Sequence, residues 1–315
     1  MKKMYCFLLI LLITTACKTT SGDPNNSKIL HLNLERIDPQ TWDIQKTEEE
    51  INPGKLGIVV VDMWDQHWCK SHSFRDEAMI PEMNRVLDKA RSSSVQVIFS
   101  PADVLDFYSD FPQRKKLNEM QKVRIPEYPV LQELVAMDKA EREKLELKRY
   151  FEHTMYEARV HQDSVFKGYP TLSPFHQTGG CECGIGEECV NRKAWSRQHA
   201  DLVMRENDLI IDGNSSEELY RVCKHLGITH LIFMGTAANM CVTWTRSSSL
   251  INMANRGIKC IVAEDLLNSI TGNGFNPDTG MDDPGLTPEK GNRMVIDHIK
   301  TYMAPAVDCG ELFKN

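Results

Sequence analysis

The stretch KLGIVVVD, residues 55–62, is the part of the sequence that indicates the fold most directly. The residues from Ile58 to Val61 are all β-branched, and no polar residue alternates with them. A continuous apolar run of this kind is typical of a strand buried on both faces, as in the middle of a parallel sheet. Asp62 would then stand at the carboxyl end of that strand.

Strands and helices are expected to alternate on both sides of this stretch. The predicted strands are residues 95–100, 208–212, 230–235 and 257–263, and the predicted helices are residues 81–90, 216–226, 239–255 and 288–302. Gly227 and Gly257 each follow a helix as its stop signal. This alternation predicts an α/β fold, a three-layer αβα arrangement with a mainly parallel sheet.

A long irregular excursion, from about residue 103 to 205, interrupts the regular pattern. Helices are expected within it at residues 129–148 and 192–204, and the remainder is rich in Gly, Pro, His and Cys. Such a stretch inside a compact domain forms an excursion with its own structure or a lid. Neither end resembles an interdomain linker, so we predict a single domain over residues 29–310.

Residues 1–16 resemble a bacterial lipoprotein signal peptide. Two lysines precede the apolar residues 4–13, a stretch too short to span a bilayer. Cys17 follows Ala16, and in a lipoprotein this cysteine carries the lipid after cleavage. Residues 17–28 would be a polar tether. We expect an exported protein that is lipid-anchored to a bacterial membrane, periplasmic or on the cell surface; the alternative is an ordinary signal peptide with a coincidental cysteine.

Charge and cysteine content restrict the partners. The net charge of −7 and the scattered basic residues give no footprint for nucleic acid. Cys181, Cys183 and Cys189 are clustered, but their spacing is not a standard zinc spacing, and export permits disulfides. A disulfide within this cluster, or from it to Cys69, is the expectation, and the pairing is left open.

Polar residues follow the carboxyl ends of the predicted strands, where parallel sheets bind ligands. They include Asp62, Asp103, Asp106 and Cys241. Unpaired backbone N–H groups and the helix dipole stabilise a thiolate in the first turn of a helix. Cys241 is therefore a candidate nucleophile, and the alternative is a buried structural cysteine.

The segment GTAANMCVT, residues 235–243, resembles the nucleophile turn of the isochorismatase-like cysteine hydrolases. That family includes nicotinamidases and N-carbamoylsarcosine amidases. The run IVVVD that ends at Asp62 is similar to the family's first strand, which ends in the catalytic aspartate. The resemblance extends roughly from Leu56 to Tyr302, with the excursion largely outside it.

The resemblance implies a cysteine-dependent hydrolase of a small amide-type (C–N) substrate, acting through a thioester without a cofactor. Asp62 would be the base and Cys241 the nucleophile. A cis peptide bond between Thr236 and Ala237 is implied, which would let the N–H groups of Ala237 and Cys241 hold the oxyanion. Family members often form oligomers, so a homo-oligomer is the expectation by analogy.

Two departures from the family's pattern stand out. Residues 210–216, where the family has its catalytic lysine, contain no lysine, and Arg197 and Lys167 are the candidates to replace it. The region after the second strand lacks the histidines of the nicotinamidase metal site, so we predict that no metal is bound.

Aromatic residues beside the proposed base suggest a pocket for a small-molecule substrate. Trp64, His67 and Trp68 would form its wall together with Asn239; the alternative is that the tryptophans pack under the excursion. A rival function is a non-catalytic small-molecule-binding lipoprotein that kept the hydrolase fold. A serine hydrolase is disfavoured because no Gly-x-Ser-x-Gly elbow is present.

Overall fold

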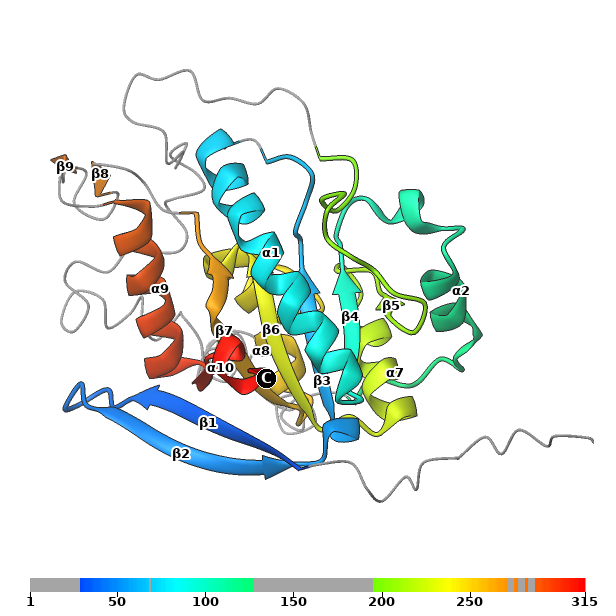
Figure 1. The fold of residues 1–315 in the computed structure, drawn as a ribbon, viewed down its shortest axis with the longest axis horizontal. Helices are drawn as coiled ribbons and strands as arrows, with labels where there is room; N and C mark the ends of the chain where they lie inside the picture. The colour runs from blue at the N-terminus through cyan, green and yellow to red at the C-terminus, as the bar shows by residue number, and fades with distance from the viewer. Residues whose placement is uncertain are drawn as a thin grey trace, which may run out of the picture.

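A computed structural model describes residues 29–67, 69–126, 195–270, 275–276, 281–282 and 287–314. An eight-stranded sheet runs through the molecule in the order β2-β1-β10-β7-β6-β3-β4-β5 (Figure 1). The strands from β10 to β5 are parallel to one another, as predicted. The strand bounds are β1 Leu30–Ile37, β2 Ile44–Ile51, β3 Leu56–Val61, β4 Gln96–Ser100, β5 Leu209–Ile210, β6 His230–Thr236, β7 Lys259–Asn268 and β10 Ala306–Val307, beside a small hairpin of β8 Phe275–Asn276 and β9 Met281–Asp282.

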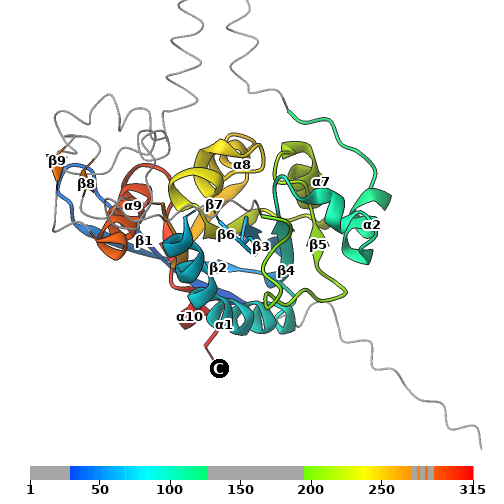
Figure 2. The same cartoon turned by 90° about the horizontal axis from the view of Figure 1, so that it is seen from above.

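Helices cover both faces of this sheet, which confirms the three-layer α/β architecture. Figure 2 shows α1 and α10 on one face and α7 and α8 on the other. The α-helices are α1 Lys70–Ser92, α2 Pro112–Glu119, α7 Ser216–Leu226, α8 Leu250–Ala254, α9 Pro288–Tyr302 and α10 Cys309–Leu312. Short 3-10 helices are η1 Pro53–Lys55 and η2 Leu105–Tyr108, and η3 Ala238–Thr245 is a π-helix.

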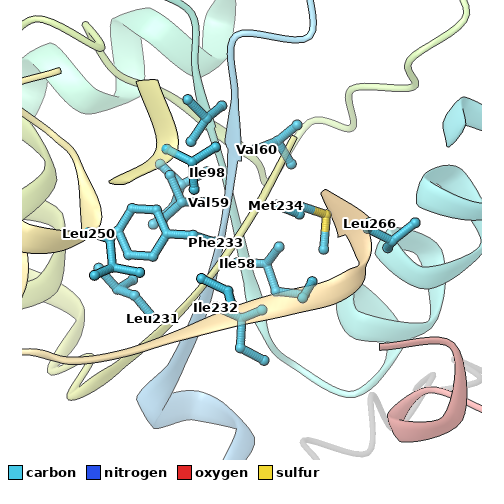
Figure 3. Close-up of a cluster of buried hydrophobic side chains, with 14 of the residues drawn as sticks. Ile58, Val59, Val60, Ile98, Leu231, Ile232, Phe233, Met234, Leu250 and Leu266 are labelled. Atoms are coloured by element: carbon cyan, nitrogen blue, oxygen red, sulfur yellow. The ribbon is translucent and has the colours of Figure 1, made fainter. Parts of the chain in front are cut away.

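The predicted central strand lies in the middle of the sheet, between β4 and β6. All six residues of β3 are buried. Val59 and Phe233 point to one side of the sheet with Leu250 of α8, whereas Ile58 and Met234 point to the other side (Figure 3). Burial of each such side chain contributes about 1.5–3 kcal/mol, so this cluster holds the carboxyl ends of β3 and β6 firmly in register.

Helix α1 begins eleven residues earlier than the sequence analysis predicts, at Lys70 instead of Pro81. Pro81 lies inside the helix, where a proline normally breaks one backbone hydrogen bond. The buried residues His72, Asp76, Ile80 and Met83 follow helical spacing across it. Tertiary burial of this stripe therefore overrides the local signal of the proline.

Two other predicted helices are corrected. Over its described part the predicted helix at residues 192–204 is wrong, because residues 195–199 are not helical and pair with the segment after β3, as in the bridge between Trp64 and Gln198. The predicted helix at residues 239–255 is interrupted: the π-helix η3 ends at Thr245, and α8 begins at Leu250.

The antiparallel strands β1 and β2 are an addition that the sequence analysis does not predict. They form a long arm at the edge of the sheet (Figure 1), and β1 pairs with β10. Lys300 of α9 is fully buried against this arm, and its ammonium group donates to Glu35 of β1 at 2.9 Å and Glu264 of β7 at 2.7 Å.

Several predictions lie outside the described residues: the signal peptide and tether, the cysteine cluster, the helix at residues 129–148, Lys167 and Trp68. Within the parts of the chain that the structure describes, no helix is long and apolar enough to cross a membrane.

Candidate active site

The site forms where the carboxyl ends of β3 and β6 lie side by side. Val61 pairs with Gly235 in the parallel register, so Asp62 meets the turn that follows β6. Gly235 has a φ of 109°, and a Cβ atom there would lie 2.3 Å from the carbonyl oxygen of Val61. Only glycine allows this close approach of the two strand ends.

The turn after β6 carries the predicted nucleophile. The peptide bond between Thr236 and Ala237 is cis, as the resemblance implies. The chain then enters η3, in which the amide of Val242 donates to the carbonyl oxygen of Ala237 at 3.2 Å. The Cys241 side chain is almost fully buried, and its thiol receives a backbone hydrogen bond from Ala237.

Asp62 is fully buried next to the thiol of Cys241, with which it shares a hydrogen bond. Its Oδ1 accepts from the amide of Ala102 at 2.7 Å, and its Oδ2 accepts from Nε of Arg246 at 3.0 Å. Burial raises the pKa of Asp62 to about 6, although the charge of Arg246 opposes this rise. At neutral pH the carboxylate is therefore charged, and it lies beside a proton that it can accept.

Arg246 supplies the positive charge of the site, and the sequence analysis did not identify it. Besides Asp62, its guanidinium donates to Asp103 Oδ2 at 3.0 Å and to Asn214 Oδ1 at 3.2 Å, and it lies 5.6 Å from the centre of the Trp64 ring. Burial opposes its charge, but the carboxylate of Asp62 raises the pKa of Arg246 further above its usual value.

Of the two predicted substitutes for the lysine, Lys167 lies outside the described residues, and Arg197 is not brought to this position. The guanidinium of Arg197 lies over the Phe107 ring, at 5.7 Å from the ring centre. Arg246 directly follows η3, where the backbone becomes extended, and from this position its side chain reaches Asp62. An arginine five residues after the cysteine is the sequence signal that could have found it.

The thiol of Cys241 holds its proton in this arrangement. Burial and the neighbouring charge of Asp62 raise the pKa of Cys241 to about 12, against the opposing effects of Arg246 and the Ala237 amide. A neutral thiol beside a charged carboxylate is the starting state for a proton transfer that is coupled to nucleophilic attack.

A pocket of about 290 Å³ opens onto Cys241. Its wall is formed by Trp64, His67, His72, Asp103, Trp195, Thr236, Ala237, Met240, Cys241, Thr245, Arg246 and Ile270. Trp64 and Trp195 stack at 4.2 Å between ring centres, and the indole N–H of Trp64 donates to the carbonyl oxygen of Ala102 at 3.2 Å. The predicted residues Trp64 and His67 thus reach the pocket, and Trp195 and His72 join them from segments that the sequence analysis did not connect with it.

Asn239 is not brought into the pocket wall. It is fully buried behind the wall, where its side chain donates to the carbonyl oxygen of Ile270 at 2.6 Å and accepts from the amide of Ile270 at 3.0 Å. Asn239 thereby holds the pocket residue Ile270 in place. Among the described residues, no group of three or more His, Cys, Asp and Glu side chains is arranged to hold a metal ion.

No protein-family model matches the sequence, and no curated protein matches it either. Three solved structures illustrate what the chain is similar to. A cysteine hydrolase from Pseudomonas syringae pv. phaseolicola 1448A has a TM-score of 0.45 at 15% identity, with 84% of this chain and 93% of that chain covered. An isochorismatase from Pseudomonas putida KT2440 has a TM-score of 0.44 at 11% identity, with 83% and 91% covered. The pyrazinamidase of Pyrococcus horikoshii in complex with zinc has a TM-score of 0.37 at 12% identity, with 80% and 98% covered. At such scores and identities, the function of the chain has to be argued from its own residues.

Proposed function

We propose that this protein is a cysteine-dependent hydrolase of a small amide-type compound and acts through a thioester intermediate. The observation that carries the proposal is the buried group of Cys241, Asp62 and Arg246, which opens onto a pocket of about 290 Å³. A pocket of this size lies at the low end of small-molecule sites, which favours a small substrate.

In the proposed acylation step, Asp62 accepts the thiol proton while the sulfur of Cys241 attacks the carbonyl carbon. The carbonyl π electrons move to oxygen, and the backbone N–H groups of Ala237 and Cys241 hold the resulting oxyanion. When the intermediate collapses, the C–N bond breaks and the protonated Asp62 gives its proton to the leaving amine. Arg246 stays charged throughout and keeps Asp62 oriented by the bond from its Nε atom.

Deacylation repeats the same roles with water as the nucleophile. Asp62 removes a proton from the water, the hydroxide attacks the thioester carbon, and the S–C bond breaks. The acid product leaves, and Cys241 recovers its proton from Asp62. One carboxylate thus serves both half-reactions, which suits its pKa of about 6.

The proposed function is tested with a library of small amides and ureido compounds. The full chain is assayed beside Cys241→Ala and Asp62→Asn, with Cys223→Ala as a matched control because Cys223 is a buried cysteine of α7 outside the pocket wall. We expect Cys241→Ala and Asp62→Asn to abolish turnover and Cys223→Ala to retain it. Turnover that survives Cys241→Ala contradicts the mechanism.

A non-catalytic binding protein is the second candidate, favoured by the raised pKa of the Cys241 thiol and by the protein contacts that occupy Arg246. Alkylation by iodoacetamide near neutral pH separates the two. Burial also raises the pKa of Cys223 to about 12, but Cys223 has neither Asp62 nor the pocket beside it, so the Asp62→Asn variant isolates the effect of the carboxylate. Faster labelling of Cys241, lost in Asp62→Asn, supports the hydrolase; equally slow labelling of both supports the binding protein.

We further propose that the protein is exported and anchored by a lipid on Cys17. The support is the signal-like sequence of residues 1–16. Expression of the full chain and of Cys17→Ser, followed by membrane fractionation and mass measurement, tests it. A membrane-bound wild type of increased mass and a Cys17→Ser variant without the lipid are the expected results.

A further inference from the structure

A buried polar network lies beside the pocket and has no part in the mechanism proposed above. It begins at Arg75 of α1, whose Nε and Nη2 atoms donate to Oδ1 of Asn268 at 3.1 and 2.5 Å. Because arginine can only donate, these contacts fix the orientation of the Asn268 amide. Its NH₂ group must therefore face the other way, toward Asp76 Oδ1 at 2.6 Å and Nδ1 of His72 at 3.1 Å.

This orientation fixes the tautomer of His72. An NH₂ group donates, so Nδ1 of His72 is the acceptor, and the proton of the neutral imidazole sits on Nε2. Nε2 lies 2.5 Å from Oγ1 of Thr236. His72 therefore donates to the hydroxyl oxygen of Thr236, with Asp76 Oδ2 at 3.4 Å from the same nitrogen.

The hydroxyl hydrogen of Thr236 therefore points away from His72 and needs another acceptor. Within the described part of the chain, its one hydrogen-bond acceptor is the carbonyl oxygen of Asn268, at the long distance of 3.4 Å. Thr236 is nearly fully buried and lines the same pocket as Cys241, directly before the Ala237 amide. A buried donor with one poor partner is costly, and a better acceptor on a ligand would lower that cost.

We propose that the Thr236 hydroxyl, aligned by His72, is a substrate-binding donor that selects acyl compounds with a hydrogen-bond acceptor two or three bonds beyond the reacting carbon. The inference rests on the proposed function, because it places the donor beside the carbon that Cys241 attacks. Arg75, Asn268 and His72 act as positioning residues, which hold the Thr236 oxygen as an acceptor and so leave its hydrogen available for an acceptor on a ligand.

Reversible aldehyde adducts of Cys241 test this inference without knowledge of the substrate. An aldehyde adds to the thiol: the S–C bond forms, and the thiol proton ends on the former carbonyl oxygen. Two matched pairs differ by an ether oxygen in place of a methylene, methoxyacetaldehyde against butanal and 3-methoxypropanal against pentanal. The affinity of each is measured on the full chain as protection of Cys241 from iodoacetamide, followed by mass spectrometry.

We expect Thr236→Val to lower the preference for the ether aldehyde in at least one pair by about three- to tenfold, the effect of one hydrogen bond. Thr236→Ser should keep the preference, because it keeps the hydroxyl. Thr243→Val is the matched control: the Thr243 hydroxyl also lies in the turn region but donates to the carbonyl oxygen of Ala238 at 2.8 Å, outside the pocket wall. It should leave the preference unchanged.

Comparison of two aldehydes on one variant cancels any general damage to the site, because such damage weakens both adducts alike. A preference that Thr236→Val leaves unchanged in both pairs overturns the inference, while adduct formation itself still supports Cys241 as the nucleophile. If the wild-type chain forms no adduct with any of the four aldehydes, the nucleophile is contradicted, and the inference falls with it.

Discussion

Two opposing effects act on the carboxyl group of Asp62, and burial is the larger one. The positive charge of Arg246 and the amide of Ala102 lower the pKa, yet burial leaves it at about 6 against an ordinary value of 3.8. The difference corresponds to about 3 kcal/mol against the charged form. A base of this strength is charged at neutral pH and still binds a proton well enough to carry it from the thiol to a leaving group.

The proposed hydrolysis should depend on pH through this group. The base works only when it is unprotonated, so we expect kcat/KM to rise as the pH increases through about 6 and to level off above it. A pH profile on any amide that is turned over measures this limb. A limb near pH 4 would mean that Asp62 titrates like an exposed carboxylate and is not the base.

Arg246 should matter through its charge as well as its position. Arg246→Met leaves the buried carboxylate of Asp62 without its cation, which costs about 3–5 kcal/mol or forces the carboxyl to stay protonated at neutral pH. We expect the activity to fall at least about 100-fold and the acidic limb to move to higher pH. Arg246→Lys keeps the charge, so its activity should lie between those of the wild type and Arg246→Met. An acidic limb that stays at the same pH in Arg246→Met contradicts the role of this charge.

Asp62 and Cys241 could be predicted from the sequence because each follows a strand whose apolar run is visible locally. Arg246 could not be predicted in the same way. In an α-helix, residues five apart lie on different sides, whereas here a π-helix followed by the extended backbone of Arg246 separates it from Cys241. The position of His72 could not be predicted either, because Pro81 suggested the start of a helix and His72 lies in the part of α1 that precedes it.

At the scale of elements, the close approach of β3 and β6 depends on Gly235. Gly235→Ala places a Cβ atom 2.3 Å from a backbone oxygen of β3, so the strand ends must separate. Gly257→Ala is the matched control, because Gly257 also has a positive φ, 81°, but no atom lies within 4 Å of the added Cβ.

We expect Gly257→Ala to lower the free energy of unfolding by about 1 kcal/mol and to keep the activity. Gly235→Ala should cost more than about 3 kcal/mol and lose the activity, since Asp62 and Cys241 move apart. Urea unfolding and the amide assay measure the two effects. Equal losses in the free energy of unfolding for the two variants would show that the close contact of the strands does not require glycine at position 235.

The bounds of an element are predicted to within one or two residues where both of its ends carry a recognisable capping residue. Helix α7 has the Ser215 cap at its start and Gly227 with a φ of 66° at its end, and the predicted and observed bounds agree. The helix prediction for residues 195–199 is wrong because their backbone hydrogen bonds go to Met63 and Asp65, which are far away in the sequence. Such pairing leaves no periodic pattern in the segment itself.

For the whole molecule, the arm of β1 and β2 is attached through the buried ammonium group of Lys300. Lys300→Met leaves Glu35 and Glu264 without their shared cation, and we expect a loss of about 3 kcal/mol in the free energy of unfolding. Lys46→Met removes the other lysine that contacts Glu35, at 2.7 Å, but this side chain is exposed, so the loss should be at most about 1 kcal/mol. Thermal unfolding of both variants checks the difference, and equal losses would contradict the anchoring role of Lys300.

The central layers of the molecule were predictable, whereas its edge was not. Parallel strands are apolar throughout and stand out in a sequence, as β3 and β6 do. The edge strand β2 is exposed along most of its length and carries Glu48, Glu49 and Glu50, which read as a solvated loop. Its place in the sheet is set by β1 beside it, a contact that no local pattern encodes.

The position of Arg246 has a consequence for how such proteins can be recognised and can diverge. The proposed nucleophile, the proposed oxyanion amide and the cation that faces Asp62 all lie between Ala237 and Arg246, on one short segment of the chain. The segment after β5 therefore does not have to supply this cation, and Asn214 there contacts both Arg246 and Asp103. A search that demands a lysine after β5 would discard chains of this kind, whereas a cysteine followed by an arginine five residues later would retrieve them. The segment could therefore be transferred as one unit between proteins of the same fold.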